Sequence, residues 1–127
     1  MHTENETLQI LIKFRHLFIY SDKMPAEAKD SQRLVMVRSG AGINCRTFVF
    51  KNEGHTLGNV LRSVIMQNPQ VVFCGYSLPH PAEDQMYLRI QTVEGVDAQD
   101  ALLKGLTDLK KMTAHAKEVF ETAVAAQ

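Results

Sequence analysis

The residues that could carry chemistry in this sequence are five histidines, two cysteines and one pair of adjacent carboxylates. Cys74 and His80 lie close together along the chain, and a thiol beside an imidazole is the arrangement of a nucleophilic cysteine. Such a site also needs a group that orients the imidazole and backbone donors for an oxyanion, and no motif here supplies them. We therefore predict no catalytic residue. His55 is expected instead to hold a strand-to-helix junction, and His80 to order a loop flanked by prolines.

Neither a metal site nor a nucleic-acid surface is indicated. Glu83 and Asp84 are adjacent carboxylates, and two such groups do not complete a coordination shell. Cys45 and Cys74 lack the spacing of zinc ligands, which predicts small, buried, reduced thiols. The 14 basic and 14 acidic residues cancel, so no excess positive charge is left to neutralise phosphates. We expect no cofactor, no metal ion and no direct sequence-specific binding of nucleic acid.

Residues 1–33 are predicted to form a flexible N-terminal extension. They divide into a mixed apolar stretch at 8–20 and a polar segment at 21–33 with the composition of a solvated tail. Charges interrupt the apolar stretch, which is shorter than the roughly 20 residues that a membrane-spanning helix needs. It therefore predicts neither a membrane anchor nor a signal peptide, and no membrane partner is expected. Its pattern fits a strand or a helix.

Residues 34–127 are predicted to form a single domain. Short runs rich in β-branched and aromatic residues predict four strands, at 34–38, 46–51, 71–76 and 86–92. The first two strands are separated by a glycine-containing turn at 39–42 and are expected to pair as a hairpin. In the fourth strand Met86, Leu88 and Ile90 alternate with more polar side chains, as in a strand that is buried on one face.

A short helix is predicted from His55 to no later than Asn68. Thr56 is its expected N-cap, and Pro69 ends it because the residue before a proline avoids helical geometry. Gly58 is unfavourable inside a helix by roughly 1 kcal/mol relative to alanine. Its presence one turn from the start indicates that another backbone comes close, such as that of a second chain.

A long final helix is predicted from Ala98 towards Ala126, with Asp97 as its N-cap. Apolar residues recur along one of its faces at steps of three and four: Leu102, Leu106, Leu109, Met112, Ala116, Val119, Phe120 and Ala123. At 1.5 Å per residue the helix spans roughly 40 Å, which is longer than a domain of this size needs to cover its sheet. We therefore expect it to overhang the domain and its apolar face to bind a partner.

The order of elements is strand-strand-helix-strand-strand-helix. A sheet with both helices on one face is the two-layer arrangement of an α+β domain. The sequence therefore predicts the α+β fold class, and the unpaired helix surface indicates a protein that works by binding another protein.

A run of residues in the first helix also carries a family resemblance. His55, Thr56, Leu57, Gly58, Asn59, Leu61 and Arg62 resemble the dimerisation signature shared by bacterial RNA polymerase α subunits and the small α-like subunits of archaeal and eukaryotic polymerases. The motifs Asn68-Pro69, Phe73-Cys74-Gly75-Tyr76, Pro79-His80-Pro81, Leu88-Arg89-Ile90-Gln91-Thr92 and Gly105-Leu106-Thr107-Asp108-Leu109 follow in the order and spacing of the eukaryotic subunits. The motif at 73–76 is more similar to the small α-like subunit common to RNA polymerases I and III than to its RNA polymerase II counterpart. The resemblance covers residues 34–122.

This resemblance implies the α-like dimerisation fold and a non-catalytic role in polymerase assembly. Such subunits pair with a larger α-like subunit through packed helices. The heterodimer is the platform for the large catalytic subunits of RNA polymerases I and III, which transcribe rRNA, tRNA and 5S RNA in the nucleolus and nucleoplasm of the nucleus. The implied partner-binding residues lie on both helices: His55, Thr56, Leu57, Gly58, Asn59, Leu61, Arg62, Ile65, Leu102, Leu106, Leu109 and Phe120.

Three alternatives remain open from the sequence. The chain is also compatible with the equivalent subunit of RNA polymerase II or of an archaeal polymerase, which differ in the large subunits that co-purify. A stand-alone homodimeric binding module of the same fold would associate without a partner. A small enzyme that uses Cys74 and His80 is the last alternative, since a shared fold does not by itself choose a function.

Overall fold

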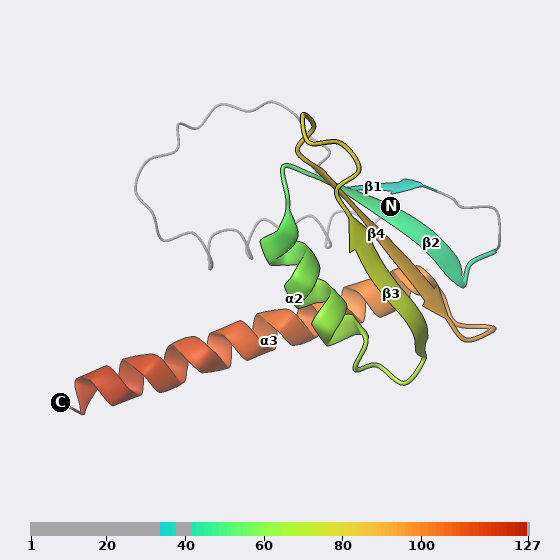
Figure 1. The fold of residues 1–127 in the computed structure, drawn as a ribbon. Coiled ribbons are helices and arrows are strands. Elements are labelled where there is room, and N and C mark those ends of the chain that lie inside the picture. Colours follow the sequence, from blue (N-terminus) through green and yellow to red (C-terminus); the bar gives the residue numbers. More distant parts are fainter. Residues whose placement is uncertain (1–33, 38–41, 127) are drawn as a thin grey trace.

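A computed structural model describes residues 34–37 and 42–126, as four strands and two helices (Figure 1). The elements are β1 (Leu34–Val37), β2 (Cys45–Lys51), α2 (His55–Ile65), β3 (Val71–Ser77), β4 (Gln85–Thr92) and α3 (Ala98–Ala125). Their order is the predicted one, and each predicted strand end agrees to about one residue. The predicted extension at 1–33 and most of the turn at 39–42 lie outside the described residues.

The four strands form one antiparallel sheet in the spatial order β1-β2-β4-β3. The predicted hairpin of β1 and β2 is confirmed, and β3 and β4 form a second hairpin. The two hairpins join where β2 lies beside β4, with Phe48 opposite Leu88. This central pairing brings together strands that α2 and β3 separate along the chain.

Both helices pack on the same face of the sheet, which gives the predicted two-layer α+β domain. The alternating residues Met86, Leu88 and Ile90 of β4 are fully buried beneath them, as the pattern predicted. The core that they share consists mainly of Phe48, Phe50, Leu57, Leu61, Val64, Ile65, Cys74, Met86, Leu88, Ile90, Ala98, Ala101, Leu102, Leu106 and Leu109. Burial of this continuous apolar face stabilises the domain.

The start of α2 differs from the prediction, whereas the start of α3 agrees with it. The N-cap of α2 is Gly54, in extended geometry and without a side-chain cap, and Thr56 lies in the first helical turn. The prediction that Thr56 is the N-cap is therefore wrong, because the helix begins two residues earlier than its side chain would require. In α3, Oδ1 of Asp97 accepts a hydrogen bond from the Gln99 amide at 2.8 Å, which confirms the predicted cap.

The glycine in α2 is approached by side chains of its own chain. A Cβ at Gly58 would lie 2.6 Å from Cδ2 of Tyr76 in β3 and 2.8 Å from Sδ of Met86 in β4. Within this chain the close approach at Gly58 is therefore made by side chains of its own sheet and not by another backbone, since the missing side chain lets α2 lie close to that sheet. Whether a second chain comes near this helix stays a prediction. The close helix approach occurs instead at Gly105 of α3, where a Cβ would overlap with Cγ1 of Ile65 in α2.

Candidate partner-binding surface

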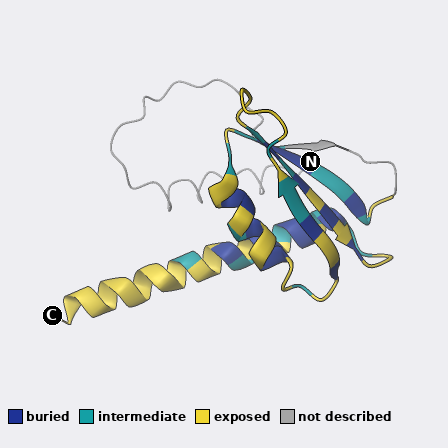
Figure 2. Ribbon diagram, viewed as in Figure 1, coloured by how far each residue is buried: buried dark blue, intermediate teal, exposed yellow. Residues whose placement is uncertain are grey.

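The long helix α3 divides into a buried half and an exposed half (Figure 2). Six of its residues between Ala98 and Leu109 are buried in the domain. From residue 110 to residue 126 every side chain is exposed except that of Thr113, which is half-buried. We call residues 110–125 the overhang, which extends roughly 24 Å at 1.5 Å per residue. The predicted overhang is thus confirmed.

The overhang carries large apolar side chains on one side. Met112, Val119, Phe120 and Val124 are 52%, 52%, 69% and 54% exposed. Met112 follows the buried Leu109 by three residues, so the apolar stripe continues the face that packs on the sheet. Beyond the domain edge this face has no core to cover within the part of the chain described here. A contiguous apolar surface of this kind marks a protein-protein contact.

The predicted partner-binding residues divide into two groups in the structure. Seven lie in the domain's own core: Leu57, Gly58, Leu61, Ile65, Leu102, Leu106 and Leu109. Five are exposed: His55, Thr56, Asn59, Arg62 and Phe120. A partner can reach the exposed group without unfolding the domain, whereas the buried group can act by holding α2 against α3. Whether any of the twelve contacts a partner stays a prediction.

Three exposed residues of the stripe are absent from the partner-binding residues that the resemblance implied, although the helical spacing placed two of them, Met112 and Val119, on the apolar face expected to bind a partner. They are Met112, Val119 and Val124. The helical spacing that placed Met112 and Val119 on the apolar face also placed Leu102 and Leu106 there. Spacing shows which face of the helix is apolar, but it does not show where along the helix the sheet ends.

His55 links the start of α2 to β3. Its Nδ1 lies 3.0 Å from Oη of Tyr76, and the two rings meet edge to face with centroids 5.7 Å apart. The Tyr76 ring also fills the space left by Gly58. This contact confirms the prediction that His55 ties down the junction into the helix.

We expect Tyr76→Phe to lower the free energy of unfolding by about 0.5–1.5 kcal/mol, because the hydroxyl is lost while the ring still packs on Gly58. Urea unfolding followed by circular dichroism measures the change. Tyr87→Phe is the control, since the Tyr87 hydroxyl makes a longer contact of 3.4 Å with Gln85. Equal effects of the two substitutions would show that the His55 contact contributes no more stability than the longer contact of Tyr87 with Gln85.

The cysteine and histidine considered for catalysis lie in different environments. Cys74 is buried in the core, whereas His80 is exposed on the loop after β3. Burial raises the pKa of the Cys74 thiol from its ordinary 9.0 to about 11, and the positive charge of Arg62 opposes part of this shift. A cysteine nucleophile acts as the thiolate, which requires a lowered pKa. Cys74 therefore has the properties of a structural core thiol.

We expect the stability of the chain to fall as the pH rises from about 9 to about 11, because the pKa of Cys74 is raised on folding. Below this range the thiol is protonated in both states, and within it the unfolded chain loses the proton first. Urea unfolding at a series of pH values measures the effect. Cys74→Ala removes this contribution, so an identical pH dependence in that variant would contradict the assignment.

The described residues form neither a cluster of metal ligands nor a membrane-spanning helix. Among them, no three His, Cys, Asp or Glu side chains gather to hold a metal ion. No helix in the same part of the chain combines the length and apolar character needed to cross a membrane.

The chain is a small two-layer α+β domain whose last helix extends beyond its own sheet. Residues 45–119 match the family described as the RNA polymerase Rpb3/Rpb11 dimerisation domain. The solved structure of DNA-directed RNA polymerase subunit L from Thermoplasma acidophilum has the same fold. Its TM-score is 0.61 over 75% of this chain and 93% of that chain, with 19% sequence identity.

The chain belongs to the RNA polymerase Rpb3/Rpb11 dimerisation domain family. It is 52% identical over 81 residues to the DNA-directed RNA polymerases I and III subunit rpc19 of Dictyostelium discoideum, covering 64% of this chain and 70% of the relative. It is 46% identical over 97 residues to the DNA-directed RNA polymerases I and III subunit RPAC2 of Danio rerio, covering 76% of this chain and 87% of the relative. The resemblance carried by the motifs from His55 to Leu109 is therefore confirmed.

Proposed function

We propose that this chain is a non-catalytic assembly subunit of DNA-directed RNA polymerases I and III. It pairs with a larger α-like subunit, and the pair is the platform for the large catalytic subunits that transcribe rRNA, tRNA and 5S RNA. The observation that carries this proposal is the overhang, where the apolar face of α3 leaves its own domain. The relatives support it, since they are named as subunits of both polymerases.

The pairing surface that we propose combines the overhang with the exposed positions of α2. On α3 it consists of Met112, Val119, Phe120 and Val124, which are all more than half exposed. On α2 it consists of His55, Thr56, Asn59 and Arg62, which are exposed and polar. An apolar centre with a polar margin is the usual composition of a specific protein interface.

The proposed role places the chain in the nucleus. Assembly into RNA polymerase I places it in the nucleolus, and assembly into RNA polymerase III places it in the nucleoplasm. A fluorescent fusion expressed at its natural level tests this assignment, because a chain present in one of the two compartments alone would serve one polymerase.

Co-expression with the larger α-like subunits of the same organism tests the proposed function. Native mass spectrometry of the soluble product is expected to show a one-to-one complex with the subunit shared by RNA polymerases I and III. A complex with the RNA polymerase II counterpart alone would assign the chain to that enzyme. A homodimer that persists in the presence of every larger subunit would contradict the assembly role and favour a stand-alone binding module.

A further inference from the structure

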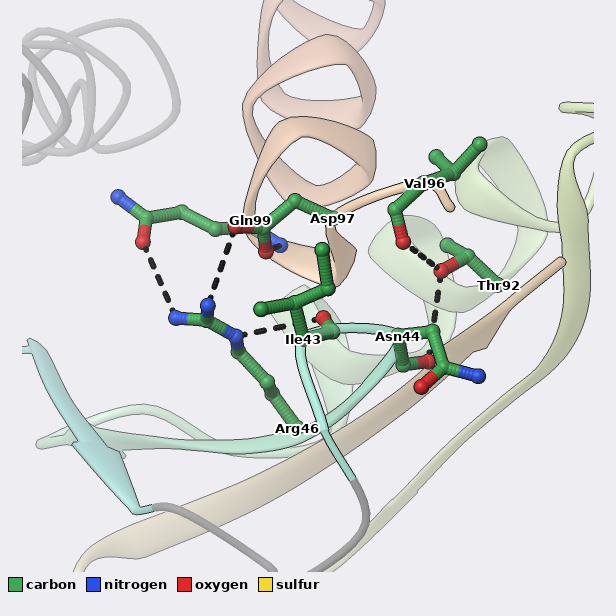
Figure 3. Close-up of polar contacts among 7 residues, drawn as sticks. All are labelled: Ile43, Asn44, Arg46, Thr92, Val96, Asp97 and Gln99. Carbon is green, nitrogen blue, oxygen red and sulfur yellow. Dashed lines mark hydrogen bonds and ion pairs between the residues drawn. The ribbon is translucent and has the colours of Figure 1, made fainter. Parts of the chain in front are cut away.

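Arg46 in β2 joins the sheet to the first turn of α3 (Figure 3). Its Nη2 donates to Oδ2 of Asp97 at 3.1 Å, and its Nη1 lies 3.5 Å from Oε1 of Gln99. The side chains of Arg46 and Asp97 are 15% and 29% exposed, so solvent screens this ion pair less than a pair on the open surface. We call the contacts of Arg46 with Asp97 and Gln99 the clasp.

The clasp adds to a backbone contact at the same end of α3. The Ala98 amide donates to the Ile43 carbonyl at 3.0 Å, and Nε of Arg46 donates to the same carbonyl at 3.3 Å. Asp97 also caps the helix through its other carboxylate oxygen. One carboxylate therefore both starts α3 and binds it to the sheet.

A second support of α3 lies at its crossing with α2, where Gly105 meets Ile65. At 1.5 Å per residue, Asp97 lies roughly 12 Å before this crossing and Phe120 roughly 22 Å after it. Between this crossing and Phe120, the side chains from residue 110 onward are exposed, apart from the half-buried Thr113. A rigid helix that pivots at the crossing thus moves Phe120 almost twice as far as it moves the clasp.

We propose that Arg46 is a positioning residue for pairing with the larger α-like subunit. Through the clasp, Arg46 sets the direction in which the overhang leaves the domain. This inference rests on the proposed function, because it takes the overhang as the pairing surface. Six buried residues of α3 keep the helix docked without the clasp, so losing the clasp changes its direction and does not unfold it. Apolar contacts across an interface weaken with gaps of about 0.5–1 Å, so a small rotation is enough to reduce pairing.

Three variants of the full chain test this proposal. Arg46→Met keeps the aliphatic stem and removes the guanidinium, and Arg46→Lys restores a cation. Lys104→Met is the matched control, because it removes the ion pair of Lys104 with Asp108 at 2.6 Å, whose two ends both lie on α3. That pair cannot orient the helix relative to the sheet.

Each variant is measured in two ways. The distance between spin labels at Ser77→Cys on β3 and Glu121→Cys on the overhang reports the helix direction in the free chain, since both positions are exposed and the two native cysteines are buried and label slowly. The dissociation constant with the larger α-like subunit reports pairing. Thermal unfolding by circular dichroism shows that each variant is folded.

We expect Arg46→Met to shift or broaden the label distance and to weaken pairing by about tenfold or more. Arg46→Lys should partly restore the wild-type label distance and affinity. Lys104→Met should leave the label distance and the affinity as in the wild type. An unchanged distance in Arg46→Met would overturn the proposal whatever happens to pairing. A shifted distance with wild-type affinity would overturn it too.

The outcome for Phe120→Asp separates this inference from the proposed function. If that variant still pairs, the overhang is not the pairing surface, and the proposed function loses its central observation even where Arg46→Met shifts the helix. If Phe120→Asp fails to pair while Arg46→Met changes neither distance nor affinity, the pairing surface stands and the positioning role of Arg46 is wrong.

Discussion

Phe120→Asp is expected to abolish pairing with the larger α-like subunit while the chain keeps its fold. The Phe120 side chain is 69% exposed in the isolated domain, so the domain does not depend on it. At an interface, loss of a buried aromatic anchor costs about 2–4 kcal/mol, and burial of an unpaired carboxylate adds to this cost. Affinity should therefore fall by at least about 100-fold. Isothermal titration calorimetry with the purified partner measures the change.

Ala114→Asp is the matched control for this experiment. Ala114 is exposed on the same overhang, on the side of the helix away from the apolar stripe, and the substitution adds the same charge. It should pair with nearly wild-type affinity, and both variants should unfold at the wild-type temperature. Equal losses of affinity from the two substitutions would show that the added charge, and not the loss of an apolar side chain from the stripe, weakens pairing.

Aspartate at the buried positions does not answer the same question. Leu61 and Leu106 are fully buried in the domain, so a carboxylate there disrupts the core before any partner is met. The overhang separates the two effects, because its side chains form the proposed pairing surface and lie outside the core.

Gly105→Val is expected to destabilise the domain by about 3 kcal/mol, because the new side chain must occupy space held by Ile65. The direction of this change in stability is informative. Replacing a glycine inside a helix usually raises the free energy of unfolding by up to about 1 kcal/mol, because it lowers the backbone entropy of the unfolded chain. Here the overlap with Cγ1 of Ile65 outweighs that gain, and α2 and α3 must move apart. Urea unfolding of the purified chain measures the free energy of unfolding.

Two further variants test the cause of this loss. Gly105→Val combined with Ile65→Ala should be more stable than the sum of the single effects, since the second change opens the space that the first requires. Thr107→Val places the same side chain at an exposed position of α3 and should change stability by less than about 1 kcal/mol. Strict additivity of the double variant would contradict a direct contact between the two helices.

The elements, their order and the family were predictable from the amino-acid sequence. Alternation in Met86, Leu88 and Ile90 predicted a strand buried on one face, and Asp97 predicted the start of α3. These signals are local, because side-chain period and capping depend on residues a few positions apart. The motif beginning at His55 supplied the family, which the matched residues 45–119 confirm.

Which elements lie beside one another could be seen only in the folded chain. The tertiary structure placed β4 beside β2, turned Gly58 towards Tyr76 and Met86, and put the close approach of the helices at Gly105. It also divided one apolar stripe into a buried half and an overhang. The spacing of apolar residues along a helix is the same whether or not a sheet lies beneath that helix. Burial depends on contacts between residues far apart in the chain, so the candidate surface emerged only where α3 passes the edge of its own sheet.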